Sequence, residues 1–367
     1  MRVGYVLGLD PDPAGSVVST LSFIRRLMSD SSVEYLWNDC HTSASSLLAV
    51  GVRAIANSGA LGARSGRSAH VLVSGFLGVG KRNRLNIAEH LSGCEILHLM
   101  DGNALPYVGS LPSLPKVVSV PDSMHFEGPM SQRFGPVGLL HRMSYFNLSK
   151  VNHVVTYSQF SKRALQRVFG KRLPPTTVIQ FPVLMSRRLP RQAARRSLGL
   201  PSEGGIGLQV SSTAPWKGLE TFYDVAEMIP ECKFIRVGAP LRTGSVSHEQ
   251  KVSRERLELL YSAADFLIST STYEGACMPL YEAIGCGLPV ISSSIEPARE
   301  ALGSAGLYAD SSGSVGSYVE AIRALLSSPD LQRRISDSMK ARRLSLSPEE
   351  FIAQLVGVYS RVGRQLS

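Results

Sequence analysis

The chain has 367 residues, of which 44% are hydrophobic and 19% are charged. These values are typical of a folded globular protein and exclude a disordered chain, and the length suggests two domains of ordinary size. No apolar run approaches the roughly 20 residues that a membrane span needs, and the N-terminus has no signal-peptide layout. The five cysteines are scattered without metal-ligand spacing. We therefore expect a cytoplasmic protein with reduced thiols and no metal site.

The net charge of +10 is concentrated in the first half of the chain. Residues 1–185 contain 18 Lys and Arg against 10 Asp and Glu, whereas the remaining residues contain 21 against 19. Such a basic half attracts acidic partners, for example a phosphorylated acceptor or the anionic inner face of a membrane, or it only keeps the protein in solution. No nucleic-acid-binding motif accompanies the charge, so we expect no nucleic acid partner.

Short apolar runs alternate with helical or loop stretches through the first half, which is the βαβ rhythm of a parallel sheet. The predicted strands are residues 2–9, 33–37, 70–76, 96–100, 116–120, 151–157 and 177–181. After the first strand, residues 10–16 form a loop rich in Gly and Pro, and such loops are where a doubly wound sheet meets its ligand. Gly15 is the glycine in this loop that a phosphate would approach.

Residues 75–81 fit the G-x4-G-K pattern of a phosphate loop after an apolar strand. That loop needs Ser or Thr at the next position, because the hydroxyl holds Mg²⁺. Arg82 stands there instead. We therefore do not expect nucleoside triphosphate hydrolysis.

A basic linker after residue 185 predicts a domain boundary there. In the second domain, strand 206–210 is followed by Lys217-Gly218 and an amphipathic helix, and strand 234–238 ends at Gly238. A helix over 251–262 precedes the strand 266–268, and further helices follow residues 315 and 330. Ser347-Pro348-Glu349-Glu350 is a capping box that starts a final helix.

The stretch that follows strand 266–268 carries the clearest chemical signal. Pro279 suits the first turn of a helix, Gly285 and Gly287 are expected to end that helix, and a strand begins at Val290. The loop Gly275, Ala276, Cys277 and Met278 would then present backbone N–H groups at a helix N-terminus, which suits a phosphate.

Two acidic residues flank this anion site. Glu274 lies directly before the loop, and Glu282 lies one helical turn inside the helix. Together with Gly-Leu-Pro-Val-Ile at 287–291 and Glu300, the stretch resembles the E-x7-E signature of retaining glycosyltransferases with the GT-B fold, most closely glycosyltransferase family four. The resemblance implies an α/β protein with two Rossmann-like βαβ domains, an interdomain cleft and a nucleotide-diphosphate sugar as donor.

The resemblance also implies roles for single residues. Glu274 would act on the transferred sugar, Glu282 would hold the ribose hydroxyls, and Lys217 would neutralise the donor diphosphate together with the loop 275–278. Gly238 would lie near the nucleotide base. The family often has an arginine six residues before the lysine, where this chain has Ser211.

In the first domain the family commonly places a catalytic histidine after the strand 116–120. Pro121 occupies that position here, and His125 is the candidate that stands nearest to it. We expect residues 1–185 to bind the acceptor, 186–346 to bind the donor, and the helix within 347–367 to pack back on the first domain.

The predicted activity is the transfer of a sugar to a glycan, glycolipid or small-molecule acceptor without a metal or cofactor, with surface polysaccharide synthesis as the expected setting. Two alternatives stay open: a nucleotide-sugar epimerase or phosphorylase on the same fold, and a weakly catalytic partner subunit of a glycosyltransferase complex.

Overall fold

The structure is a computed structural model. It describes residues 2–6, 34–38, 94–99, 102, 105, 108–109, 111–128, 142–143, 145–183, 185, 189–242, 244–250, 252–310 and 313–364. The chain divides into two compact units, one formed by Met1–Ile179 with Phe351–Ser367 and the other by Gln180–Glu350. Gly15 and the phosphate-loop pattern at 75–81 lie outside the described residues.

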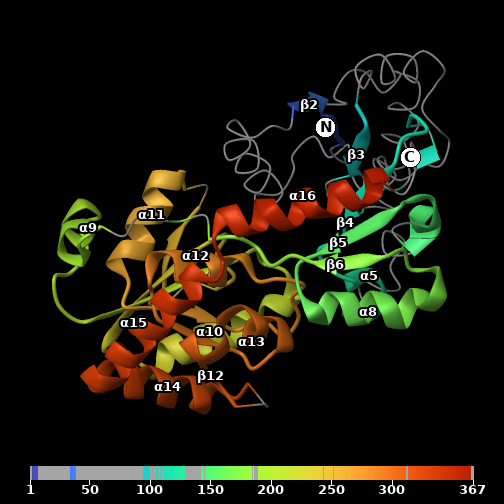
Figure 1. Ribbon diagram of the computed structural model, residues 1–367. Coiled ribbons are helices and arrows are strands. Elements are labelled where there is room, and N and C mark those ends of the chain that lie inside the picture. Colours follow the sequence, from blue (N-terminus) through green and yellow to red (C-terminus); the bar gives the residue numbers. More distant parts are fainter. Residues whose placement is uncertain are drawn as a thin grey trace, which may run out of the picture. The chain divides into compact units, whose positions relative to one another are not determined.

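The first unit contains a parallel sheet with the strand order β2-β1-β3-β4-β5-β6 (Figure 1). Its strands are β1 (Arg2–Val6), β2 (Glu34–Asn38), β3 (Ile96–Leu99), β4 (Lys116–Ser119), β5 (His153–Thr156) and β6 (Thr176–Val178). The described helices of this unit are α5 (Met124–Glu127), η2 (Tyr145–Lys150), α8 (Gln159–Phe169) and η3 (Gly170–Arg172). Strands β3 and β4 are buried on both faces, as continuous apolar runs in a parallel sheet require.

Helix α8 begins where it does because of Ser158. The Ser158 hydroxyl accepts a hydrogen bond from the Ser161 backbone N–H at 3.0 Å, which caps the helix. The Ser161 hydroxyl in turn donates to the Pro121 carbonyl oxygen at 2.9 Å. The start of α8 is thereby fixed to the segment that follows β4.

The terminal helix α16 (Pro348–Arg364) lies against β3 in the first unit (Figure 1). Ser347 caps it by accepting from the Glu350 N–H at 3.1 Å, as the capping box predicts. His98 on β3 shares hydrogen bonds with the Tyr359 hydroxyl at 2.6 Å and the Ser119 hydroxyl at 3.0 Å. Burial lowers the pKa of His98 to about 3, so the imidazole is neutral and joins α16 to the sheet.

The second unit contains a parallel sheet with the strand order β12-β11-β10-β7-β8-β9. Its strands are β7 (Gly205–Val210), β8 (Cys232–Val237), β9 (Ser247–Glu249), β10 (Phe266–Ser269), β11 (Val290–Ser292) and β12 (Gly306–Tyr308). Its helices are α9 (Arg191–Ser197), η4 (Pro215–Lys217), α10 (Leu219–Met228), α11 (Arg254–Ala263), α12 (Met278–Cys286), α13 (Glu296–Leu302), η5 (Gly303–Ala305), α14 (Val315–Ser327) and α15 (Pro329–Leu344). The α/β class with parallel sheets, predicted from the rhythm of apolar runs, is confirmed.

One glycine behaves differently from the prediction. Gly287 ends α12 with a left-handed backbone, φ +63°, as expected. Gly285 was expected to end the helix too, but it lies inside α12. A Cβ at this position would lie 2.0 Å from the Met185 carbonyl oxygen, so the glycine allows close packing of α12 on the segment that enters the unit.

Candidate functional site

The residues singled out in the second half gather at the carboxyl ends of adjacent strands. The segment 211–218 follows β7, Gly238 follows β8, and residues 270–277 follow β10, which is hydrogen-bonded to β7. In open α/β sheets ligands bind at this edge. The sheet order therefore brings Lys217, Gly238 and Glu274 to one edge of the second unit.

The turn before α12 presents backbone donors. Cys277 is the N-cap, with φ −73° and ψ 93°, and its side chain makes no capping hydrogen bond. Pro279 follows at the start of the helix, where its missing N–H costs nothing. Within the described part of the chain, the N–H groups of Ala276, Cys277 and Met278 have no acceptor. The beginning of α12 therefore offers donors and a partial positive charge to an anion.

Lys217 and Glu274 form an ion pair beside this turn. The Lys217 Nζ donates to the Glu274 Oε1 at 2.5 Å, and the two side chains are only 18% and 10% exposed. A lysine ammonium carries three N–H donors, so Lys217 can hold a carboxylate and an anionic ligand at once. Glu274 is thus positioned by a cation that lies beside the start of α12.

The backbone around Lys217 is attached to the loop after β10. The Thr270 hydroxyl donates to the Lys217 carbonyl oxygen at 2.9 Å, and the Thr272 N–H donates to the Trp216 carbonyl oxygen at 2.8 Å. Gly218 has φ +61°, and a Cβ there would lie 2.1 Å from the Thr270 carbonyl oxygen. These contacts fix the distance between Lys217 and Glu274 before any ligand arrives.

Glu282 lies on α12 and faces α11. The Tyr261 hydroxyl donates to its Oε2 at 2.8 Å, and the Arg254 Nη1 lies 3.7 Å from its Oε1. Burial raises the pKa of Glu282, while the Tyr261 hydrogen bond and the Arg254 charge oppose that rise. One carboxylate oxygen therefore accepts a hydrogen bond from Tyr261, and the other forms a long ion pair with Arg254.

Gly238 ends β8 in a conformation that other residues rarely adopt, with φ +143°. A Cβ there would lie 2.3 Å from the Ser211 carbonyl oxygen. The glycine therefore lets the ends of β7 and β8 approach one another closely.

Cys277 is not a nucleophile in this arrangement. Its thiol is buried, and burial together with the Glu274 charge raises its pKa to about 12. The thiol is therefore protonated near neutral pH, and a protonated thiol is a weak nucleophile.

The first-unit candidates are placed only in part. His125 lies in the short helix α5, after Pro121 and the end of β4. The Met124 N–H donates to the Asp122 Oδ1 at 2.9 Å, which shapes the turn before this helix. The assignment of His125 stays a prediction.

Sequence reasoning missed the residues that support this site. Tyr261, Arg254, Thr270 and Thr272 all act through contacts between segments that lie far apart in the chain. None of them has a local pattern that would have marked it. Gly218, in contrast, carried a local signal, since a glycine before an amphipathic helix often adopts positive φ.

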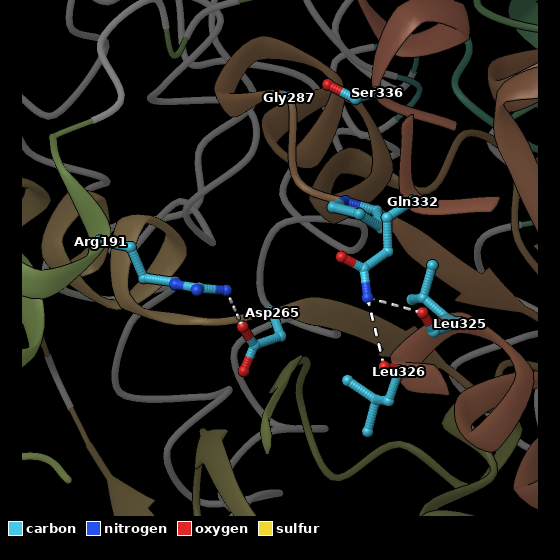
Figure 2. Close-up of a pocket in the computed structure, with 8 residues that line it drawn as sticks. Arg191, Asp265, Gly287, Leu325, Leu326, Gln332 and Ser336 are labelled. Carbon is cyan, nitrogen blue, oxygen red and sulfur yellow. Dashed lines mark hydrogen bonds and ion pairs between the residues drawn. The ribbon is translucent and has the colours of Figure 1, made fainter. Parts of the chain in front are cut away.

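A cavity of about 200 Å³ lies at the opposite edge of the same sheet (Figure 2). Its lining includes Asp265 and Pro289, which directly precede β10 and β11. Arg191 points to Asp265 across this cavity, and Gln332 donates to the Leu325 carbonyl oxygen at 2.8 Å (Figure 2). Arg191, Asp265 and Gln332 are thus engaged with the protein, at the edge of the sheet away from the candidate site.

No group of three or more His, Cys, Asp and Glu residues among the described residues is placed to hold a metal ion. None of the helices in the described ranges has the length and apolar character needed to cross a membrane.

Comparisons with known proteins match the part of the chain that holds this site. Residues 190–342 match the family model described as glycosyl transferases group 1. O-antigen chain mannosyltransferase B of Escherichia coli is 41% identical over 69 residues, which are 19% of this chain and 18% of that protein. The chain thus aligns with less than a fifth of the length of this relative.

Solved structures match over nearly the whole chain. Sucrose-phosphate synthase from Thermosynechococcus elongatus superposes with a TM-score of 0.72 at 16% identity, covering 98% of both chains. Alr3699/HepE of Anabaena, solved in complex with UDP-glucose, gives 0.69 at 16% identity and covers 98% of this chain and 100% of that one. The fold is the GT-B fold, in which each of two α/β units contains a parallel sheet. The family model covers residues 190–342, and this part of the chain carries the candidate site.

Proposed function

We propose that this protein is a retaining glycosyltransferase that takes a sugar from a nucleotide-diphosphate donor. The observation that carries the proposal is the Lys217–Glu274 ion pair beside the backbone amides of residues 276–278, which have no acceptor in the described part of the chain. The Lys217 ammonium suits a phosphate, and the Glu274 carboxylate suits a sugar hydroxyl or a developing positive charge. The match of this unit to glycosyl transferases group 1 supports the same assignment.

The donor diphosphate would lie against the start of α12. Backbone amides and a lysine can stabilise negative charge as it grows on a leaving phosphate, and they need no rearrangement to do so. These groups supply what a metal ion would otherwise provide, so we propose a reaction without metal or cofactor. Gly238, by keeping the ends of β7 and β8 together, would leave room for the nucleotide base.

Glu274 would act on the transferred sugar. Held by Lys217, it would accept hydrogen bonds from sugar hydroxyls or stabilise the oxocarbenium-like centre that forms as the bond to phosphate breaks. The acceptor oxygen would attack from the same face, and its proton would pass to the departing phosphate. Retention without a protein nucleophile agrees with the protonated state of the buried Cys277 thiol.

Glu282 would hold the ribose hydroxyls, with Tyr261 keeping its carboxylate in place. Tyr261→Phe should weaken donor binding about fivefold, the worth of one ordinary hydrogen bond. The lost bond normally lowers the pKa of Glu282, so the variant carboxylate would protonate at higher pH. Donor affinity in the variant should therefore fall earlier as the pH decreases.

Calorimetric titration of the donor across pH measures both effects. Tyr308→Phe is the matched control, since the Tyr308 hydroxyl donates to the Gly303 carbonyl oxygen and not to Glu282. Equal donor affinity and equal pH dependence in Tyr261→Phe and wild type would contradict the role given to Tyr261.

The acceptor would bind to the basic first unit. His125 would lie near the transferred sugar, and Gly15 would lie near the donor phosphates. A glycan, a lipid-linked acceptor or a small molecule fits the proposal, and surface polysaccharide synthesis is the proposed setting. An anionic membrane face is the proposed location, supported by the excess of Lys and Arg in residues 1–185.

Thermal unfolding in the presence of UDP-, GDP- and dTDP-sugars tests the proposal. A bound donor stabilises the native state, so one of these nucleotide sugars should raise the melting temperature. At a concentration 100 times its dissociation constant, the donor should raise the free energy of unfolding by about 2.7 kcal/mol. Incubation of that donor with acceptors should then yield a product with the donor's anomeric configuration. Isomerised donor without acceptor would instead indicate an epimerase. No stabilisation by any nucleotide sugar would contradict the proposal.

A further inference from the structure

The second unit contains a buried arginine that has no acidic partner among the residues that the structure describes. Arg236 lies on β8, two residues before Gly238, and its side chain is inaccessible to solvent. Its guanidinium donates to backbone carbonyl oxygens: Nη1 to Ala239, and Nη2 to Ser211 at 3.2 Å and Ser212 at 3.3 Å. Its Nε has no acceptor within the described residues.

The neighbours of Arg236 do not neutralise its charge. The strand register places Gln209 of β7 on one side and His248 of β9 on the other. The Tyr223 hydroxyl on α10 bonds to the His248 Nε2 at 2.8 Å, and the Gln209 amide nitrogen donates to the Ser211 hydroxyl at 2.6 Å. The side-chain Oε1 of Gln209 is buried and has no hydrogen-bond partner among the described residues. None of the carboxylates that the structure describes forms an ion pair with Arg236.

An unpaired buried cation is unfavourable unless an anion offsets it. Arginine stays protonated in proteins, so the cost cannot be removed by losing the proton. The three carbonyl groups that accept from Arg236 belong to the segments that follow β7 and β8. One of these segments leads to Lys217 and the other begins at Gly238. Both lie at the edge of the sheet where we propose that the diphosphate binds.

We propose that Arg236 is a positioning residue that fixes the turn 211–212 and supplies a second positive charge toward the donor diphosphate. The inference rests on the proposed function and deepens it. Because the guanidinium is covered, it acts through this turn and through its field, which is strong across a poorly solvated interior. Lys217 is the cation that contacts the ligand, and Arg236 is the cation behind it.

Binding of nucleotides that differ only in phosphate number tests this role. The probes are a nucleoside, its monophosphate and its diphosphate. All three carry the base of the nucleotide sugar that stabilises the wild-type protein most. Arg236→Met should weaken the diphosphate about tenfold, the effect of removing a nearby charge in a medium of intermediate dielectric constant. The nucleoside should lose little affinity, and Arg236→Lys should recover part of the diphosphate affinity.

Arg242→Met is the matched control, since Arg242 lies nearby in the sequence but is partly exposed and paired with Asp224 and Glu220. It should leave diphosphate affinity unchanged. The salt dependence of diphosphate binding should also become shallower in Arg236→Met than in wild type and stay close to wild type in Arg236→Lys, a readout that a purely structural role would not change. Should Arg236→Met fail to fold, Arg236→Gln also removes the charge and gives both readings.

The outcomes separate the two proposals. A wild-type protein that binds no nucleoside diphosphate contradicts the proposed function and this inference together. A wild-type protein that binds it, with Arg236 variants that lose nucleoside and diphosphate affinity equally, or lose neither, contradicts the inference alone.

Discussion

Glu274→Gln is expected to reduce turnover by about 10²-fold or more, a typical loss when a positioned charge-stabilising group is removed. The amide keeps the size of the side chain but carries no charge, so it cannot stabilise a cationic sugar centre. Lys217 would lose its ion pair with Glu274 but keep the positive charge that attracts the donor phosphates. We therefore expect the donor dissociation constant to stay equal or decrease while kcat falls.

Initial rates at varied donor concentration, together with calorimetric titration of the donor, separate these two effects. Glu231→Gln is a suitable control, because Glu231 is an exposed acid of the same unit with only a long ion pair, 3.6 Å, to Arg323. Full turnover in Glu274→Gln would remove Glu274 from the mechanism. A large loss of donor affinity with unchanged kcat would assign it to binding instead.

Asp265→Ala is expected to lower the free energy of unfolding by about 3 kcal/mol, because it leaves a buried guanidinium without its carboxylate. Asp265 Oδ2 accepts from the Arg195 Nη2 at 2.7 Å and from the Ile206 N–H at 2.7 Å. The Arg195 side chain is only 2% exposed. The pair joins α9 to the starts of β7 and β10, at the edge opposite to the candidate site.

Denaturant unfolding followed by far-UV circular dichroism measures this loss. Arg191→Ala removes the exposed partner of the same carboxylate and should cost less than about 1 kcal/mol, as exposed ion pairs do. The double variant Asp265→Ala, Arg195→Met should recover much of the stability, since no buried charge then remains unpaired. Equal stability of wild type and Asp265→Ala would contradict this account of the pair.

The sequence predicted elements well wherever the determinants are local. The apolar runs at 206–210 and 266–268 lie in β7 and β10, and Pro279 stands in the first turn of α12. Strand β9 (Ser247–Glu249) was not predicted, because Ser-His-Glu has no apolar pattern and the strand sits half-buried at the sheet edge. Gly285 was wrongly predicted to end the helix. A glycine stands there because the backbone of Met185 lies close to it, and no local pattern shows this contact.

The candidate site could be predicted residue by residue but not as an arrangement. Lys217 and Glu274 are 57 positions apart, and their contact follows from the pairing of β7 with β10, which sequence spacing does not give. Tyr261 and Arg236 could not be predicted for a related reason. The role of a tyrosine in a helix or an arginine in a strand depends on buried partners that are distant in the sequence.

The central claim is that a donor diphosphate lies against the turn before α12, beside Lys217. Hydrogen–deuterium exchange with and without a saturating nucleoside diphosphate tests it most directly, because bound phosphate oxygens protect the amides that donate to them. We expect slower exchange in peptides covering 275–280 and 211–218, and little change at the opposite edge around Asp265. Protection elsewhere in the chain, with the 275–280 peptide unchanged under saturating ligand, would contradict the account.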